Sequence, residues 1–385
     1  MASDSRYQGL RAELAALCAR YPTTYWRELD QRRAYPDAFV GALTSAGLLG
    51  ALIPRALGGR GMSLAEASVI VEEINHSGGN AGPYHAQMYT MGTLLRHGSE
   101  EQKRAYLPDI ASGALRLQAF AITEPEAGVD TTSITTTATR EGDHYRVTGH
   151  KIYISRVQHS DLMLLLARTT PREQVTRRSD GLSVFIVDLR QAIGHGLTVS
   201  PINVMLNNET NELTFDGLEV PAANLIGEEG QGFRYILDGL NAERILIAAE
   251  CIGDGRWFVE QATQRACERV VFGRPIGQNQ GVQFPIALAH AHVCAADLMR
   301  FRAADLFDQT QPCGAEANMA KLLAADASWE AGNVAMQTFG GYGLTVDYDI
   351  ERKFRETRLY QVAPISTNLV LAYLAEHELG LPRSY

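Results

Sequence analysis

The spacing of apolar residues changes twice along the chain and divides it into three regions. Up to about residue 117, apolar residues such as Leu10, Leu14 and Leu17 recur three or four positions apart, which predicts helices. From about 118 to 222, apolar residues alternate with polar ones or form short apolar runs, which is typical of strands. From about 223 onward the helical spacing returns.

This pattern predicts an α+β protein with an N-terminal helical domain (1–117), a middle β domain (118–222) and a C-terminal helical domain (223–385). Within the last domain we expect helices at 231–266, 280–307, 315–338 and 364–377. Ser63 and Ser99 each precede a helical run and can serve as N-caps.

The composition limits the possible classes of function. A chain of 385 residues is longer than one hydrophobic core usually supports, which agrees with several domains. The net charge of −9 argues against nucleic-acid binding. No run approaches the ~20 apolar residues of a membrane-spanning helix. Five scattered cysteines without a Cys/His cluster predict no metal site, no disulfide scaffold and a reducing, cytoplasmic location.

Four segments carry candidate chemistry. In the first, residues 119–130, an apolar run ends at Thr123-Glu124-Pro125 and opens into a loop, where backbone N–H groups and a hydroxyl can meet a ring or a phosphate. The others are residues 149–155, 269–276 and 337–343. In this order, and over residues 8–385, the four segments resemble the FAD-dependent acyl-CoA dehydrogenase family. The resemblance implies two α domains that clasp a β domain, a four-helix bundle in the C-terminal domain, and FAD at the junction.

The resemblance also assigns the contacts to FAD. Thr123 and Ser155 would face the flavin ring, where fixed donors stabilise the charge of the reduced ring. The fork of Arg269 would pair with the pyrophosphate. In the family this contact crosses a subunit interface, so the resemblance implies a homotetramer built as a dimer of dimers. The predicted cofactor-binding residues are Ile122, Thr123, Tyr153, Ser155, Arg269, Phe272, Gln280, Gln337, Gly340, Gly341, Ser366 and Asn368.

The chain departs from the family pattern at two positions near this site. Val129 stands where the family usually has Ser, near the pyrophosphate and the substrate, so one polar contact is lost. Tyr153 replaces the commoner Trp and still provides a flat aromatic wall. The predicted substrate contacts are Val129, Arg244 and Ala363.

The reaction that the resemblance implies removes a proton from the carbon next to a thioester carbonyl and passes a hydride from the β carbon to FAD. It needs a carboxylate whose pKa is raised toward neutrality by a dry pocket. Many family members carry this glutamate on a loop, at the position of Pro364 here, and proline cannot be a base. Isovaleryl-CoA-type and long-chain-type members carry it on a helix, where this chain has Glu243.

Helical spacing places Glu243 on one face with Ile236, Leu240 and Ile247. A carboxylate in an apolar stripe is costly unless it is paired or functional. We therefore predict that Glu243 is the base, and the alternative is that it pairs with a neighbouring arginine. We interpret Glu250, two turns further on, as an ordinary helix carboxylate rather than a group that supports the base.

The remaining candidates are weaker. We interpret His85, His97 and His150 as structural or exposed rather than catalytic. Because Pro364 has no N–H, the thioester carbonyl would need another backbone donor, such as Ile365. The small Ala363 and Pro364 leave room beside the α and β carbons and predict a branched, cyclic or long acyl group.

The sequence thus predicts an acyl-CoA dehydrogenase that passes its electrons to an electron-transfer flavoprotein. A rival in the same fold is an oxidase or monooxygenase, whose members typically lack the carboxylate base. A rival of another class is a non-enzymatic acyl-CoA-binding protein, which has no need for a full set of FAD residues.

Overall fold

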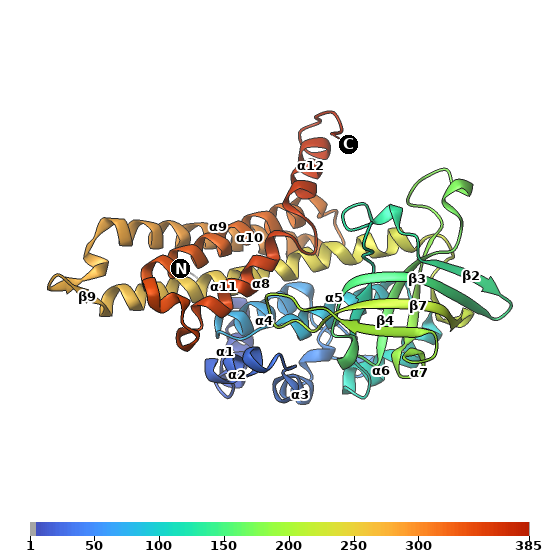
Figure 1. Ribbon diagram of the computed structural model, residues 1–385, viewed down its shortest axis with the longest axis horizontal. Helices are drawn as coiled ribbons and strands as arrows, with labels where there is room; N and C mark the ends of the chain where they lie inside the picture. The colour runs from blue at the N-terminus through green and yellow to red at the C-terminus, as the bar shows by residue number, and fades with distance from the viewer. Residues whose placement is uncertain (1–4, 385) are drawn as a thin grey trace.

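The computed structural model describes residues 5–384 and confirms the predicted fold class, with helices, then a sheet, then helices (Figure 1). The β domain lies at one end of the molecule, and the long C-terminal helices extend to the other. The N-terminal helices are α1 (Gln8–Cys18), α2 (Thr23–Arg32), α3 (Asp37–Ser45), α4 (Leu64–His76), α5 (Gly82–His97) and α6 (Glu100–Ser112).

Two N-terminal helices start at the caps that the sequence predicts. The Ser63 hydroxyl accepts a hydrogen bond from the Glu66 N–H (3.2 Å), and the Glu66 carboxylate accepts one from the Ser63 N–H (2.8 Å). Ser99 and Gln102 make the same exchange at the start of α6. Each capping box satisfies backbone groups that the first turn leaves unpaired. These ends hold α4 and α6 on either side of α5, which reaches the domain junction.

The β domain is one eight-stranded sheet in the order β6-β7-β3-β2-β4-β5-β8, with β1 parallel to β4. Its elements are β1 (Leu117–Ala121), β2 (Thr137–Glu141), β3 (His144–Ser155), β4 (Leu162–Arg168), β5 (Leu182–Asp188), the short helix α7 (Leu189–Ala192), β6 (Leu197–Pro201), β7 (Thr210–Pro221) and β8 (Leu225–Ile226). The apolar runs predicted at β4 and β5 are strands buried on both faces.

Strand β4 joins two hydrophobic cores because successive side chains point to opposite faces of a sheet. Leu162, Leu164 and Leu166 pack into the core shared with the N-terminal helices and α8. Met163 and Leu165 pack into the separate core of the β domain. The sheet is therefore fixed against the helical domains, which is what positions residues of β1 and β3 at the junction.

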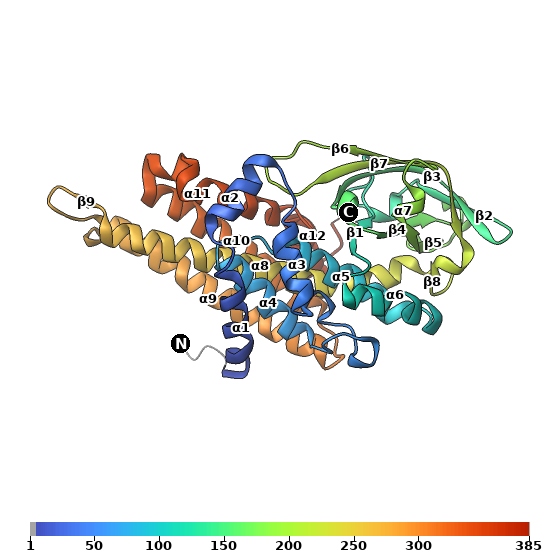
Figure 2. The same ribbon diagram turned by 90° about the horizontal axis from the view of Figure 1, so that it is seen from below.

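The C-terminal region consists of α8 (Gly232–Glu268), a two-stranded hairpin of β9 (Val270–Val271) and β10 (Arg274–Pro275), α9 (Gln280–Asp308), α10 (Gly314–Phe339), α11 (Ile350–Arg358) and α12 (Thr367–His377). Helix α8 has 37 residues and packs against α4, α5, α9 and α10. At Gly253 a Cβ would lie 2.4 Å from the carbonyl oxygen of Glu72 on α4, so only glycine permits this approach. Helix α12 leaves the bundle next to the β domain (Figures 1 and 2).

Helix α9 has an exposed apolar face. By length and composition alone, it is the one helix within residues 5–384 that could cross a membrane, and core helices of soluble proteins pass the same test. It packs along α8 and α10, while Phe284, Leu288 and Leu298 are exposed. The absence of a membrane span thus stays a prediction, and an exposed apolar face is typical of an interaction surface.

The sequence did not predict α11, because only Ile350 and Phe354 are apolar among its mostly charged residues. Its charges are buried in a network. Lys353 Nζ lies 2.5 Å from Asp254 on α8 and 3.0 Å from Glu356, and Arg352 Nη1 donates to Glu356 at 2.9 Å. Ion pairs therefore add to the apolar contacts of Ile350 and Phe354 in attaching α11 to α8.

Substitution of Lys353 with methionine should destabilise the protein by about 3–5 kcal/mol, because Asp254 would keep buried charge without its cation and Glu356 would retain only Arg352. Arg358→Met changes a half-buried cation of the same helix that lies over Trp329, and it should cost less than about 1 kcal/mol. Denaturant unfolding of both variants measures the difference. Equal losses would show that the network contributes no more than a surface cation.

Candidate active site

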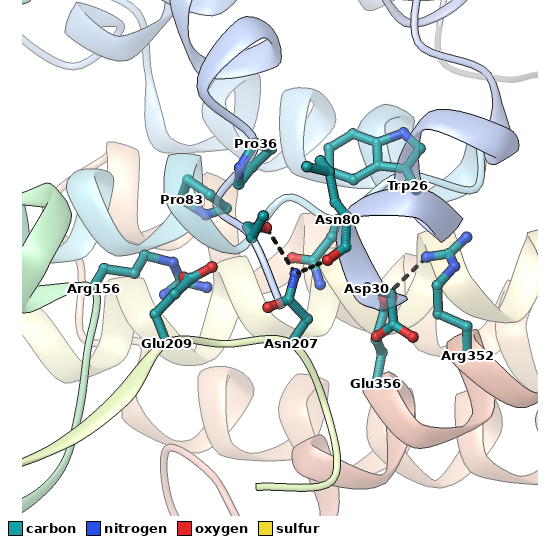
Figure 3. A pocket seen from close by; sticks show the side chains of 12 residues that line it. Trp26, Asp30, Pro36, Asn80, Pro83, Arg156, Asn207, Glu209, Arg352 and Glu356 are labelled. Atoms are coloured by element: carbon teal, nitrogen blue, oxygen red, sulfur yellow. Dashed lines mark hydrogen bonds and ion pairs between the residues drawn. The ribbon is translucent and has the colours of Figure 1, made fainter. Parts of the chain in front are cut away.

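An open cavity of about 750 Å³ lies where the three regions of the chain meet. Its walls come from segments that are far apart in the sequence. They include His85 and Tyr89 of α5, Phe120 of β1, Tyr153 and Ser155 of β3, Glu243, Ile247 and Glu250 of α8, and Ala363 and Pro364 before α12. Asn80, Arg156 and Glu356 line both this cavity and a smaller adjoining pocket (Figure 3).

Glu243 is the buried carboxyl group in this cavity that the sequence singles out. Desolvation raises its pKa to about 7, against smaller opposing effects of His85 and Arg244. Arg244 does not pair with it: the guanidinium donates to Asn241 Oδ1 at 2.8 Å, and no ion pair of Glu243 occurs within residues 5–384. A buried, unpaired carboxyl of near-neutral pKa that lines a cavity can exchange a proton at physiological pH.

Glu250 and His85 also line the cavity. Glu250 is 3% exposed and His85 is 5% exposed, and Glu250 Oε1 lies 3.3 Å from His85 Nδ1. Glu250 is therefore not an ordinary, solvated helix carboxylate. The spacing 243, 247, 250 along α8 could have revealed this, because these positions share one helix face. His97 and His150 instead pair with Asp238 and Glu212 outside the cavity.

The turn after β1 is held against β3 by a buried ion pair. Lys151 Nζ lies 2.9 Å from Glu124 Oε1 and donates to the Ile122 carbonyl at 2.7 Å, and burial lowers the Lys151 pKa to about 8. The Glu124 carboxylate also accepts hydrogen bonds from the backbone N–H groups of Thr135 and Thr136. The Thr123 carbonyl accepts from the Ile152 N–H at 2.9 Å. Ile122 and Thr123 thereby lie beside the strand that carries Tyr153 and Ser155.

Tyr153 has the strained geometry of a functional position. Its φ is +61°, where the pairing of β3 with β7 shifts register, and 62% of its surface is exposed. Ser155 is held in place because its hydroxyl accepts a hydrogen bond from Asn208 Nδ2 at 2.9 Å. An exposed aromatic face beside a fixed hydroxyl fits a flat, polar ring system such as a flavin.

The other predicted FAD residues lie elsewhere. Arg269, Gln337, Gly340 and Gly341 line a second cavity, together with Arg265, beyond the ends of α8 and α10. A Cβ built on Gly340 or Gly341 meets no atom within 4 Å, so this cavity is open, and its two guanidinium groups fit a diphosphate. The structure thus separates the residues that the sequence predicts to bind the ring from those that it predicts to bind the phosphates.

The last predicted site residues fall around these two cavities. Phe272 is fully exposed on the β9–β10 hairpin, and Gln280 begins α9. Ser366 caps α12, and Asn368 is the second residue of that helix. Of the predicted substrate contacts, Ala363 lines the first cavity, whereas Arg244 is buried outside its wall and Val129 is exposed on the loop after β1.

Comparison with known proteins agrees with this geometry. The models of the N-terminal, middle and C-terminal domains of acyl-CoA dehydrogenases match residues 5–114, 119–218 and 230–375. Acyl-CoA dehydrogenase FadE12 of Mycobacterium tuberculosis is 34% identical over 381 residues, 98% of this chain and 97% of its own. The cyclohex-1-ene-1-carbonyl-CoA dehydrogenase of Syntrophus aciditrophicus is 33% identical over 92% of this chain and 85% of its own.

A solved structure shows the same architecture. The glutaryl-coenzyme A dehydrogenase in complex with glutaryl-CoA superimposes with a TM-score of 0.92 at 29% identity, over 100% of this chain and 98% of its own. The three domain matches, the identity over almost the full length, the aromatic wall at Tyr153 and the arginine-lined second cavity lead to one conclusion: the chain belongs to the acyl-CoA dehydrogenase family and is an FAD-dependent oxidoreductase.

Proposed function

We propose that this protein desaturates an acyl-CoA thioester between its α and β carbons, with Glu243 as the base that takes the α proton. The observation that carries the proposal is a buried, unpaired carboxyl group with a pKa of about 7 on the wall of the junction cavity. A base of near-neutral pKa is ionised in a useful fraction of molecules and still binds the proton that it removes. The desolvation that raises this pKa also strengthens the basicity of the ionised form.

Residues of the two cavities would have the remaining roles. Tyr153 and Ser155 would hold the flavin ring, and Arg269, Gln337, Gly340 and Gly341 the phosphates and adenosine. FAD, when bound, supplies the acceptor for the two electrons that leave with the β hydrogen. Ile365 follows Pro364 and offers the nearest backbone N–H in sequence to replace the donor that proline lacks. Ala363 would contact the acyl chain.

Glu243 also weighs against the two rivals. Oxidases and monooxygenases of this fold use oxygen in the half-reaction that reoxidises the flavin and typically lack the carboxylate base, and a buried carboxyl without a role would cost stability. A binding protein has no need for an ionisable group of shifted pKa beside the ring site. Reduction of the bound flavin by an acyl-CoA without air, followed by slow reoxidation in air, would separate all three functions.

We further propose that one FAD is held by two subunits of a homotetramer. Twenty-six residues of helix separate Glu243 from Arg269, which is roughly 40 Å along α8. One dinucleotide cannot reach both cavities of one chain, so the second cavity of a partner must complete the site. The exposed Phe284, Leu288 and Leu298 of α9 give such a partner an apolar surface to cover. A cytoplasmic location and electron transfer to an electron-transfer flavoprotein follow from the family resemblance.

Replacement of Glu243 by glutamine should slow reduction of the flavin at pH 8 by at least ~10²-fold, because the amide cannot accept the α proton. The variant should keep its flavin and its affinity for acyl-CoA. Glu260→Gln changes an exposed carboxylate of the same helix and should behave as wild type. Anaerobic stopped-flow absorbance gives the rates, and near wild-type reduction in Glu243→Gln would refute this base.

Arg269→Ala should weaken FAD binding by about 1–3 kcal/mol, because a charge-assisted pair with the pyrophosphate is lost. Arg274→Ala removes a second cation of the same hairpin that bonds Asn279 and does not line the cavity, so it should retain the flavin. Fluorescence titration of each apoprotein with FAD, together with its sedimentation, measures affinity and assembly. A monomer that binds FAD as tightly as the assembled protein would contradict the shared site.

The acyl group should be branched, cyclic or long, because Ala363 and Pro364 leave the cavity wall small beside Glu243. The cyclic substrate named for the Syntrophus relative supports this proposal. Each methylene that fills the space should raise kcat/KM, with differences of about 10–200-fold between chains of different size. The test measures kcat/KM for butyryl-, octanoyl-, isovaleryl- and cyclohexanecarbonyl-CoA. A preference for butyryl-CoA would show that the small side chains of Ala363 and Pro364 do not select the substrate.

A further inference from the structure

We propose that Glu250 and His85 form a polar subsite that binds a hydrogen-bond donor, a hydroxyl or an amine, on the remote part of the acyl chain. This inference rests on the proposed function and names its substrate class more closely. It starts from the two polar side chains that the proposed reaction leaves without a role, although they line the same cavity as its base.

The subsite lies at the end of the cavity along α8. Glu243, Ile247 and Glu250 line the wall, and Glu250 is two turns, about 10 Å, beyond the base. Beyond Glu250, helix α8 is covered by other helices and no longer faces the cavity. Gly253 touches the backbone of α4, and Asp254 is bound by Asn75 (2.9 Å) and Lys353 (2.5 Å). A group that reaches Glu250 is therefore far from the thioester.

Both side chains keep a buried polar atom without a partner. Glu250 Oε1 and His85 Nε2 make no hydrogen bond, although Glu250 Oε1 lies 3.3 Å from His85 Nδ1. Tyr89 packs its ring edge-on against His85 and fixes the imidazole, with ring centroids 5.3 Å apart. Unsatisfied groups this deeply buried are costly unless a ligand satisfies them.

Glu72 shows how this protein treats a buried carboxylate that has a structural role. On α4, Glu72 is fully buried and forms ion pairs with Arg11, Arg256 and Arg300. No arginine or lysine forms an ion pair with Glu250 within residues 5–384, and it faces a cavity rather than packed protein. The contrast indicates that Glu250 is kept for a ligand.

The missing partner is a donor. The Glu250 carboxylate accepts hydrogen bonds, and a neutral imidazole accepts one at the ring nitrogen that carries no proton. A hydroxyl or an ammonium group can donate to these atoms, whereas a plain alkyl chain would leave both unsatisfied. The subsite should thus discriminate against unsubstituted chains of equal length.

Binding to the Glu243→Gln variant, which cannot carry out the proposed reaction, tests the subsite apart from the chemistry. The probes are hexanoyl-, octanoyl- and decanoyl-CoA and the same chains with a terminal hydroxyl or amino group, followed by the change in flavin absorbance. For one or more of the three chain lengths, the chain with a terminal hydroxyl or amino group should bind at least ~10-fold more tightly than the plain chain of the same length. When Glu250→Leu and His85→Leu are added to the Glu243→Gln variant, the plain chain should bind more tightly than the substituted one.

Two further variants interpret the result. Glu250→Gln keeps an acceptor without charge, so it should retain the preference for hydroxyl and lose that for ammonium if the charge is what binds the amine. Glu260→Gln serves as the control, and flavin content reports that each variant is folded. Tighter binding of the plain chain at every length would overturn the subsite while leaving the proposed dehydrogenation intact. Acyl-CoAs that bind but never reduce the wild-type flavin would instead overturn the proposed function.

Discussion

The structure depends on keeping one carboxyl group dry and unpaired. Water or a cation beside Glu243 would lower its pKa and weaken it as a base, because either would stabilise the ionised form. The cavity wall around it is made of α5, β1, β3, α8 and the segment before α12, so its dryness needs all three regions of the chain to meet. The raised pKa of Glu243 therefore depends on the arrangement of the three domains.

Two buried ion pairs near the junction hold its walls. Lys151 joins the turn after β1 to β3, and Lys353 joins α11 to α8. In the low-dielectric interior, each of these two pairs is specific in its geometry. Glu243 itself forms no ion pair within residues 5–384, because the neighbouring Arg244 donates to Asn241 instead.

Much of this was accessible from the sequence. The helical spacing around Glu243, with proline at the alternative position, identified the base candidate, and the two serine caps and the apolar strands were correct because they are local signals. Helix α11 was missed because its buried residues are charged, and periodicity of apolar residues cannot detect a helix that is held by ion pairs. Glu250 was misinterpreted although it shares a helix face with Glu243, because its contact with His85 of α5 is distant in sequence. The separation of the FAD residues into two cavities required the length and direction of α8.

The pH dependence of flavin reduction by an acyl-CoA tests the central claim most directly. Glu243 must be ionised to act, so the rate constant for reduction should rise as the pH increases and level off above an apparent pKa near 7. The measurement is anaerobic rapid mixing of the enzyme with octanoyl-CoA between pH 5 and pH 9, a range that brackets this value on both sides. A rate that does not change across this range, or that falls as the pH rises through 7, would contradict the account.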